Sequence, residues 1–425
     1  MGSEFLIIGS GAGGATIAKE LAESGRKVTI IEKGGFYKLG TPWRALKFYS
    51  GGILRPGELS EEKTELLRTI MVGGSTMVTL GNGVRALQSK FDELGINLEK
   101  EFSEAERELG VMNTPEDFFG PRTRILRDAS LKLGYEVKPT PKFIDFNKCQ
   151  MCGACVTGCK YGAKWTALNP LTRARRAGAK LIKNTTVEKV VHQGGEVKGV
   201  QIRNSSGIRE FKADKVILAA GGLGSPRILQ NSGLDAGDGL FADLFVITYG
   251  LSNNRGMREE LGMATVIDEF HDEYGFIISP VIDLRLDMLL YLPLMRKMIA
   301  FKRDSLLGLM TKIADDSSGK VLPNGKLKKP VTDNDLKKLE KGVKMSEEIL
   351  YQAGVKPKSI FVTGVRGAHP GGTAAIGRTV DKEFKTEING LYVCDASIFP
   401  SAPGNPPVLT LVALAKKLSS KLIME

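Results

Sequence analysis

The stretch Phe5-Leu6-Ile7-Ile8-Gly9-Ser10-Gly11-Ala12-Gly13-Gly14 decides the fold that we expect for this chain. A short apolar run that ends in glycines is typical of a buried parallel strand. Residues 15–25 then show helical spacing, and a second apolar run, Val28–Glu32, completes a β-α-β unit. The glycines fit the pattern G-x-G-x-x-G, in which the first permits a tight turn, the second lets the backbone approach a pyrophosphate, and the third lets helix and strand pack closely. The sequence therefore predicts a dinucleotide site at a helix N-terminus.

Glu32 ends the second predicted strand, where a carboxylate is placed to accept hydrogen bonds from ribose hydroxyls. The same carboxylate would repel a 2′-phosphate, which disfavours NADP. FAD and NAD both use this glycine pattern, so the pattern alone does not choose between them.

Composition sets broad limits on the class of protein. The chain has 425 residues with 42% hydrophobic and 25% charged, enough for two or three domains. Without a long uncharged apolar run or a basic leader before the first strand, we expect no membrane-spanning helix and a cytoplasmic protein. The net charge of +12 indicates either a lysine-rich surface that is merely solvated, or a surface that binds an acidic electron-transfer protein or an anionic membrane. No basic arm is interleaved with aromatic residues, so we expect no nucleic-acid partner.

Four of the five cysteines form the pattern Cys149-x2-Cys152-x2-Cys155-x3-Cys159. This spacing is typical of bacterial ferredoxins and predicts a [4Fe–4S] cluster. Zinc is the less favoured alternative, since zinc sites usually combine two C-x-x-C pairs across a longer gap. We expect Cys159 to close the same cluster, although Lys160 stands where ferredoxins have proline. Cys394 lies in an apolar run and is predicted to be a buried core thiol.

Four separated segments resemble the glucose–methanol–choline (GMC) family of flavin oxidoreductases. They are the glycine pattern with Glu32; Val72-Gly73-Gly74-Ser75-Thr76; Ala219-Ala220-Gly221-Gly222-Leu223-Gly224-Ser225-Pro226 through Asn231-Ser232-Gly233; and His369-Pro370-Gly371-Gly372-Thr373 through Asp395-Ala396-Ser397 to Gly404-Asn405-Pro406-Pro407. Their order matches the family and they span the whole chain. The chain is shorter than most members, and the well-known oxidases of the family lack the cysteine pattern.

The resemblance implies an α/β fold: a discontinuous, Rossmann-like FAD-binding domain with an inserted α+β substrate domain built on an antiparallel sheet. The FAD-binding domain is predicted to consist of residues 1–95, 166–240 and 361–425. Residues 96–165 are predicted to form a helical segment plus the cluster loop, and residues 241–360 the substrate or cap domain. The predicted FAD contacts are Gly9, Gly11, Ala12, Gly13, Gly14, Glu32, Lys33, Gly73, Gly74, Ser75, Asn82, Val187, Ala220, Gly221, Asp395, Ala396 and Pro406.

The resemblance also assigns roles near the reacting end of the flavin. His369 matches the family's catalytic histidine, and Asn405 matches its second active-site position. Asp395 matches a residue near the ribityl chain of the flavin. Val187 matches a residue whose backbone contacts the adenine. Thr79 stands where the family usually has asparagine, with Asn82 nearby.

This resemblance predicts oxidation of a CH–OH group by hydride transfer to flavin N5. A neutral imidazole such as that of His369 suits the base that accepts the hydroxyl proton, and the amide of Asn405 could hold the substrate oxygen. Pro406-Pro407 predicts a helix start whose positive end faces the flavin. A [4Fe–4S] cluster would pass single electrons to a ferredoxin-like protein or a quinone. The alternatives are a flavin/iron–sulfur electron-transfer subunit and a reductase acting on a carbonyl or double bond.

Residues 284–301 form a dense apolar run that is interrupted by Arg285, Arg296 and Lys297. The run predicts either a core or lid element of the substrate domain or an interfacial segment that contacts a membrane peripherally. In the second case the protein would be membrane-associated at the cytoplasmic face, and the substrate could be a lipid-like alcohol.

Overall fold

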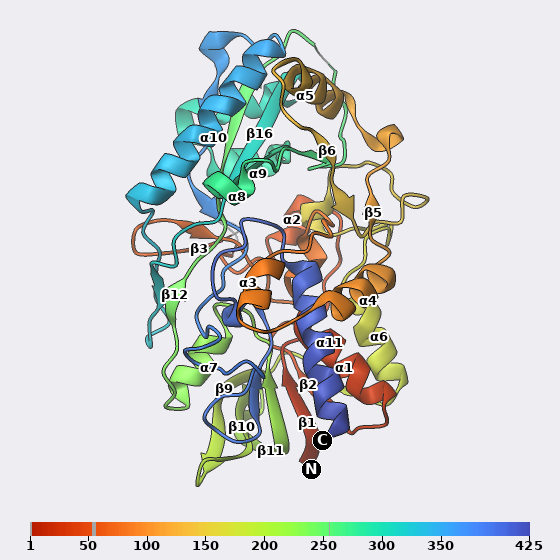
Figure 1. Cartoon of the computed structure of the whole chain (residues 1–425), viewed down its shortest axis with the longest axis vertical. Coiled ribbons are helices and arrows are strands. Elements are labelled where there is room, and N and C mark those ends of the chain that lie inside the picture. The colour runs from red at the N-terminus through yellow and green to blue at the C-terminus, as the bar shows by residue number, and fades with distance from the viewer. Residues whose placement is uncertain (1, 53–56, 255) are drawn as a thin grey trace.

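The computed structural model describes residues 2–52, 57–254 and 256–425. In Figure 1 one sheet lies in the lower half, near both chain ends, and strands of a second sheet lie in the upper half beside the long helix α10 (Asp333–Gln352). The lower sheet takes strands from the N-terminal, middle and C-terminal regions of the chain, so the chain passes between the two halves several times.

The lower sheet has the order β8-β2-β1-β11-β10-β9, and β21 pairs with β11. Its strands are β1 (Gly2–Ile8), β2 (Val28–Ile31), β8 (Lys180–Ile182), β9 (Thr186–Gln193), β10 (Glu196–Asn204), β11 (Gly207–Leu218) and β21 (Leu391–Val393). β1 runs parallel to both β2 and β11, and β21 is parallel to β11. The β9–β10 hairpin turns at Gly194-Gly195, a pair of residues that permits the positive φ of a tight turn.

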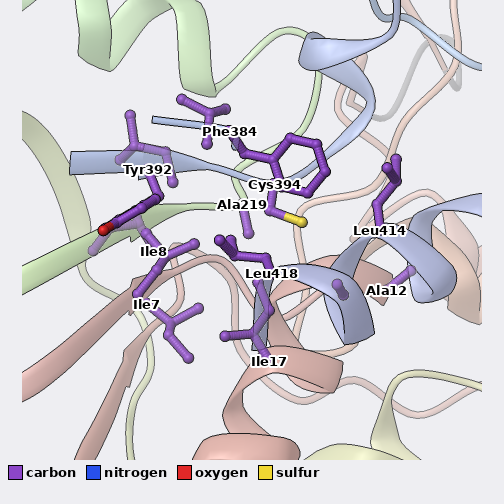
Figure 2. Close-up of a cluster of buried hydrophobic side chains, with 14 of the residues drawn as sticks. Ile7, Ile8, Ala12, Ile17, Ala219, Phe384, Tyr392, Cys394, Leu414 and Leu418 are labelled. Carbon is purple, nitrogen blue, oxygen red and sulfur yellow. The ribbon is translucent and has the colours of Figure 1, made fainter. Parts of the chain in front are cut away.

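Helices cover this sheet and complete its core. α1 (Ala12–Glu23) packs against both α6 (Leu168–Arg176) and α11 (Val408–Met424), and α4 (Glu99–Leu109) packs against α11. Figure 2 shows Ile7, Ala219, Cys394 and Leu418 meeting in this core. Cys394 is 1% exposed, which confirms its prediction as a core thiol.

The upper sheet has the order β15-β16-β13-β20-β4-β3, and β19 pairs with β13. Its strands are β3 (Glu58–Leu59), β4 (Glu65–Leu66), β13 (Leu244–Leu251), β15 (Phe276–Pro280), β16 (Leu306–Ile313), β19 (Phe361–Val362) and β20 (Arg366–Gly367). All pairings are antiparallel except that of β20 with β4. β3 and β4 belong to this sheet although we assigned residues 1–95 to the flavin domain; the segment boundaries stay a prediction.

Local sequence signals account for several element ends. α10 begins with a capping box, in which Thr332 and Asp335 each accept from the other's backbone. The remaining elements are α2 (Pro42–Ala45), α3 (Gln88–Glu93), α5 (Pro121–Lys132), α7 (Ser225–Asn231), α8 (His271–Tyr274), α9 (Arg285–Tyr291), β5 (Met112–Asn113), β6 (Lys138–Pro139), β7 (Pro141–Lys142), β12 (Asp238–Leu240), β14 (Thr265–Val266), β17 (Gly319–Val321) and β18 (Leu327–Lys328), with 3₁₀ helices η1 (Gly74–Val78), η2 (Glu116–Phe118), η3 (Cys155–Thr157), η4 (Leu294–Ser305), η5 (Pro357–Ser359) and η6 (Ala396–Ile398). Among the described helices, none has the length and apolarity needed to cross a bilayer.

Candidate active site

A cavity of about 700 Å³ follows the carboxyl ends of β1, β2 and β11 and continues to the start of α11. Crevices at the carboxyl ends of parallel strands are the usual nucleotide sites of such sheets, and this volume is within the range of ligand pockets. Its walls draw residues from the ranges 8–13, 31–33, 67–79, 185–189, 219–231, 368–370, 395–396 and 407–411. The cavity therefore joins the nucleotide-binding end to His369.

Each glycine of the first pattern has a separate steric reason. Gly9 has φ +106°, and a Cβ there would lie 2.3 Å from the carbonyl oxygen of Ala219. A Cβ on Gly14 would lie 2.1 Å from the carbonyl oxygen of Gly9. A Cβ on Gly11 would meet no described atom within 4 Å, and Gly11 lines the cavity. The backbone at Gly11 thus leaves room for a ligand at the N-terminus of α1, where N–H groups favour a phosphate.

Glu32 joins the glycine turn to the loop before η1. Its carboxylate accepts from the backbone N–H (3.0 Å) and hydroxyl (2.7 Å) of Ser10 and from the backbone N–H of Gly34 (2.8 Å). The Ser10 hydroxyl in turn accepts from the N–H of Gly73 at 3.0 Å. Burial raises the pKa of Glu32, although these hydrogen bonds oppose the shift. The residue at the end of β2 thus organises the wall on which a ribose would rest.

Asp395 braces the opposite wall. It accepts from the backbone N–H of Gly221 (2.8 Å), the hydroxyl of Ser225 (2.5 Å) and the backbone N–H of Ser397 (2.8 Å). Burial raises its pKa, again against the hydrogen bonds. Asp395 and Gly221 both line the cavity, so the second and fourth segments of the resemblance meet there.

His369 lines the cavity and is held from behind by Asp243. Nδ1 of the imidazole lies 2.8 Å from Oδ2 of Asp243, a fully buried residue with φ +48° just before β13. The buried ammonium of Lys312 lies 3.3 Å from the same oxygen. Burial, and secondly the charge of Lys312, lower the pKa of His369, against the effect of Asp243. A carboxylate that accepts from Nδ1–H leaves Nε2 with the lone pair, and the lowered pKa favours the neutral imidazole, the form that can accept a proton.

Asp243 also connects His369 to the segment that precedes α11. Its Oδ1 accepts from the backbone N–H of Gly404 at 2.9 Å, and Asn405 follows directly. Pro407, Val408 and Leu411 line the cavity, so the first turn of α11 faces the space beside His369. The predicted helix start after Pro406-Pro407 is thereby confirmed.

The predicted contact residues divide into two groups. Those that line the cavity are Gly9, Gly11, Ala12, Gly13, Glu32, Lys33, Gly74, Ser75, Val187, Ala220, Gly221, His369, Asp395 and Ala396. Those outside the lining are Gly14, Gly73, Asn82, Asn405 and Pro406. Asn82 lies behind the wall, where its amide oxygen accepts from Lys142 at 2.5 Å. Thr79 lines the cavity instead.

Sequence reasoning missed Asp243, Lys312, Arg68 and Arg227. The first two are polar residues in apolar runs, a signal that was available in 241–245 and 306–313. Arg68 and Arg227 both line the cavity and share the carboxylate of Glu58, at 2.6 and 3.4 Å. Their position next to Lys33 makes this wall cationic, which lowers the pKa of Lys33 in addition to the larger effect of burial.

The four cysteines of the ferredoxin-like spacing lie on the loop around η3, half-buried and as free thiols. Cys149, Cys155 and Cys159 pack against a small apolar cluster of Phe119, Ile144, Ala163, Leu261 and Ala264. Burial raises the pKa of Cys149 and Cys155, and the neighbouring cysteines add to the shift. In the described ranges, no three His, Cys, Asp or Glu side chains are arranged to hold a metal ion.

The fold and the cavity define a nucleotide-binding protein of the Rossmann-like class. Two family models, both described as GMC oxidoreductase, match residues 3–246 and 312–415. The chain therefore belongs to the GMC oxidoreductase family and is an FAD-dependent oxidoreductase, which confirms the expected family, fold class and flavin.

The chain is similar to curated relatives along nearly its whole length and shares its fold with solved structures. The uncharacterized protein MJ1450 of Methanocaldococcus jannaschii is 32% identical over 99% of this chain and 100% of its own length. The long-chain-alcohol oxidase FAO3 of Arabidopsis thaliana is 25% identical over 99% of this chain and 67% of its own. The crystal structure of pyridoxine 4-oxidase from Mesorbium loti has a TM-score of 0.78 at 17% identity, covering 100% of this chain and 99% of that one.

Proposed function

We propose that this protein oxidises the CH–OH group of an apolar alcohol. The observation that carries the proposal is the imidazole of His369, which lines the nucleotide cavity and whose Nδ1 lies 2.8 Å from Asp243. Bound FAD would supply a two-electron acceptor that takes the hydride from the carbinol carbon. Nε2 of His369 takes the hydroxyl proton, because its pKa is lowered and the neutral form prevails.

Asn405 is proposed to hold the substrate oxygen: Pro407 and Val408 just after it line the cavity, although Asn405 itself lies outside the lining. Asp243 fixes the backbone of Gly404 and the ring of His369 with its two oxygens, so both flanks of the reacting alcohol depend on one buried carboxylate. A substrate held in this way has its hydroxyl near Nε2 and its carbon toward the cofactor. FAD would be held by the cavity-lining residues predicted above, among them Gly9, Gly11, Glu32, Val187, Gly221 and Asp395.

An apolar alcohol is favoured by the surroundings of this end of the cavity. Ala368 and Leu67 line the cavity and also pack against the apolar cluster of Phe245, Ile247, Met288 and their neighbours, which includes residues of α9 and η4. The Arabidopsis relative carries the name long-chain-alcohol oxidase. We infer that a lipid-like alcohol enters along this side.

The test is anaerobic reduction of the bound flavin by a series of primary alcohols of increasing chain length. We expect bleaching of the flavin band by wild-type protein, faster with longer chains, and a loss of about 10²- to 10⁴-fold in rate for His369→Ala. Unchanged reduction in His369→Ala would overturn the assignment of the base. Failure of every alcohol, with reoxidation by carbonyl or enone compounds, would favour a reductase.

We further propose that Cys149, Cys152, Cys155 and Cys159 hold a [4Fe–4S] cluster, with zinc the less favoured occupant. The support is their ferredoxin-like spacing and their position as free thiols on one half-buried loop. Ligand loops commonly gain their final geometry only when metal binds. Such a cluster would supply one-electron transfer, to a ferredoxin-like protein or to a quinone.

Iron and acid-labile sulfide analysis of anaerobically purified protein tests the cluster. We expect both in wild-type protein and in Cys394→Ala, which removes the core thiol, and loss of both in Cys152→Ser. Zinc without sulfide, or iron retained in Cys152→Ser, would overturn the proposal.

Finally, we infer that η4 contacts an anionic membrane surface. Leu294, Met295, Met298 and Phe301 are 61–92% exposed, and the exposed cations Arg296 and Lys302 lie among them. Apolar side chains flanked by cations suit the interface of an anionic bilayer. The protein should sediment with vesicles of anionic phospholipid, and Met295→Ser/Met298→Ser should abolish this. Equal sedimentation of wild type and variant would contradict the contact.

A further inference from the structure

Two lysine side chains lie buried between the cysteine loop and the loop that forms the flavin wall. Lys142, on β7, is 0% exposed and Lys164 is 4% exposed. Lysine is almost never fully buried unless it is paired, because removing an ammonium from water is costly. A pair of such residues on one side of one loop therefore requires an explanation.

The two ammonium groups donate mainly to the flavin-side loop. Nζ of Lys142 donates to the carbonyl oxygen of Leu80 (3.0 Å) and the side-chain oxygen of Asn82 (2.5 Å), and to the carbonyl oxygen of Gly262 (3.1 Å). Nζ of Lys164 donates to the carbonyl oxygens of Met77 (3.2 Å) and Thr79 (2.5 Å). Thr79 lines the FAD cavity, so these lysines support its wall from behind.

The other side of both lysines faces the cysteines. Nζ of Lys164 lies 3.5 Å from the carbonyl oxygen of Cys155. Negative charge on Cys155 and Cys149 would favour the charged form of Lys142, and negative charge on Cys155 and Cys159 that of Lys164. Among the described residues, neither ammonium has a carboxylate within ion-pair distance; all the oxygens named above are neutral.

Neutral thiols would leave two buried cations without a counter-charge. Four thiolates around a dicationic [4Fe–4S] core leave a net dianion, which would balance two ammonium groups. Reduction adds one further negative charge, and nearby cations stabilise that charge most strongly where little water screens it.

We propose that Lys142 and Lys164 are positioning residues that balance the charge of the cysteine-bound cluster, raise its reduction potential and join it to the flavin wall. The inference rests on the proposed cluster. Both lysines donate hydrogen bonds to the loop that includes Thr79, which lines the FAD cavity. The two lysines therefore lie between the flavin site and the proposed cluster. With the cluster easier to reduce, electrons would leave the flavin side in the direction of the cysteine loop.

The experiment measures the midpoint potential of the cluster by anaerobic redox titration with EPR detection. Lys142→Gln and Lys164→Gln keep a hydrogen-bond donor for the loop carbonyls but remove the charge. Lys148→Gln is the matched control, because Lys148 also lies beside the cysteine loop but its side chain is 62% exposed and paired with Asp145. Each variant is also measured for iron, sulfide and flavin content.

We expect a shift to more negative potential in each buried-lysine variant, a larger shift in the double variant, and no shift in the control. If the variants contain the cluster and titrate at the wild-type potential, the lysines only brace the loop and the inference is overturned. Loss of iron and sulfide from the two buried variants, with flavin retained and the control unaffected, would also support charge balance. Absence of iron and sulfide from wild-type protein would instead overturn the proposed cluster.

Discussion

His369 Nδ1 and Asp243 Oδ2 lie 2.8 Å apart although 126 positions separate the two residues in the sequence. Asp243 precedes β13 and His369 follows β20, and these two strands pair in the upper sheet. Sheet pairing therefore brings the carboxylate to the imidazole. The same carboxylate receives the N–H of Gly404, so it links the sheet to the segment that carries Asn405.

Asp243→Asn should reduce alcohol oxidation much more than FAD content. The amide no longer secures the Nδ1–H tautomer of His369, and a loss of this kind costs up to about 10⁴-fold in a related His–Asp arrangement. We expect kcat/KM per bound flavin to fall about 10²- to 10⁴-fold. Asp238→Asn is the control, since that carboxylate is 57% exposed and pairs with Lys320 on the surface. Near wild-type turnover by Asp243→Asn would refute the role of this pair.

The pH profile of flavin reduction should depend on Lys312. His369 acts in its neutral form, so the rate rises with pH and levels off above the pKa of His369, which burial and Lys312 lower. Lys312→Met removes a positive charge next to the imidazolium, which raises this pKa and moves the ascending limb to higher pH. Asp243→Asn removes the opposing negative charge and moves it lower. Stopped-flow reduction across pH measures both shifts, and shifts of the same sign would contradict the electrostatic account.

Gly11 and Gly14 should respond differently to the same added methyl group. Gly11 has φ −73° and an open cavity beside it, so the Gly11→Ala apoprotein should unfold at the same urea concentration as the wild-type apoprotein. The added methyl group projects into the cavity, so the variant should bind FAD about 10- to 100-fold more weakly. Gly14→Ala places Cβ against the carbonyl oxygen of Gly9 and should lose about 1–3 kcal/mol of stability. Urea unfolding of the apoprotein and fluorescence titration with FAD separate the two effects. Equal loss of apoprotein stability in both variants would contradict this division.

The features of the fold that were predictable from sequence are those set by local patterns. The glycine turn, the β9–β10 hairpin and the capping box of α10 each depend on residues close together in the chain. The pairing of β4 with β20 joins residues about three hundred positions apart, so no local pattern indicates it. This is why the sequence analysis assigns residues 58–66 to the FAD-binding range 1–95, whereas the structure pairs them into the upper sheet.

Sequence could predict a site residue only where the residue occurs in a motif that assigns it one role. His369, Glu32 and Asp395 occur in motifs whose spacing indicates their positions, and all three line the cavity. Asn82 was chosen for proximity to Thr79, but its side chain points to Lys142 because the buried ammonium requires an acceptor. Asp243 and Lys312 were missed because an isolated charge in an apolar strand gains meaning only from the partner that the tertiary structure supplies.

Glu32→Gln should weaken FAD binding with little effect on the chemical step. The carboxylate accepts three hydrogen bonds, and an amide would place its NH₂ against at least one N–H or O–H donor. Charged hydrogen bonds contribute about 1.5–3 kcal/mol, so the Kd for FAD should rise about 10- to 100-fold. A ligand that binds only the native state stabilises it by RT ln(1 + [ligand]/Kd), so excess FAD should raise Tm less in Glu32→Gln than in wild type. Glu116→Gln, at a side chain 74% exposed, should behave as wild type. At saturating FAD, the alcohol should reduce the flavin of Glu32→Gln at the wild-type rate, because Glu32 lies at the nucleotide end of the cavity and His369 at the other end. A slow reaction at saturating FAD would show that Glu32 also orders the reacting end.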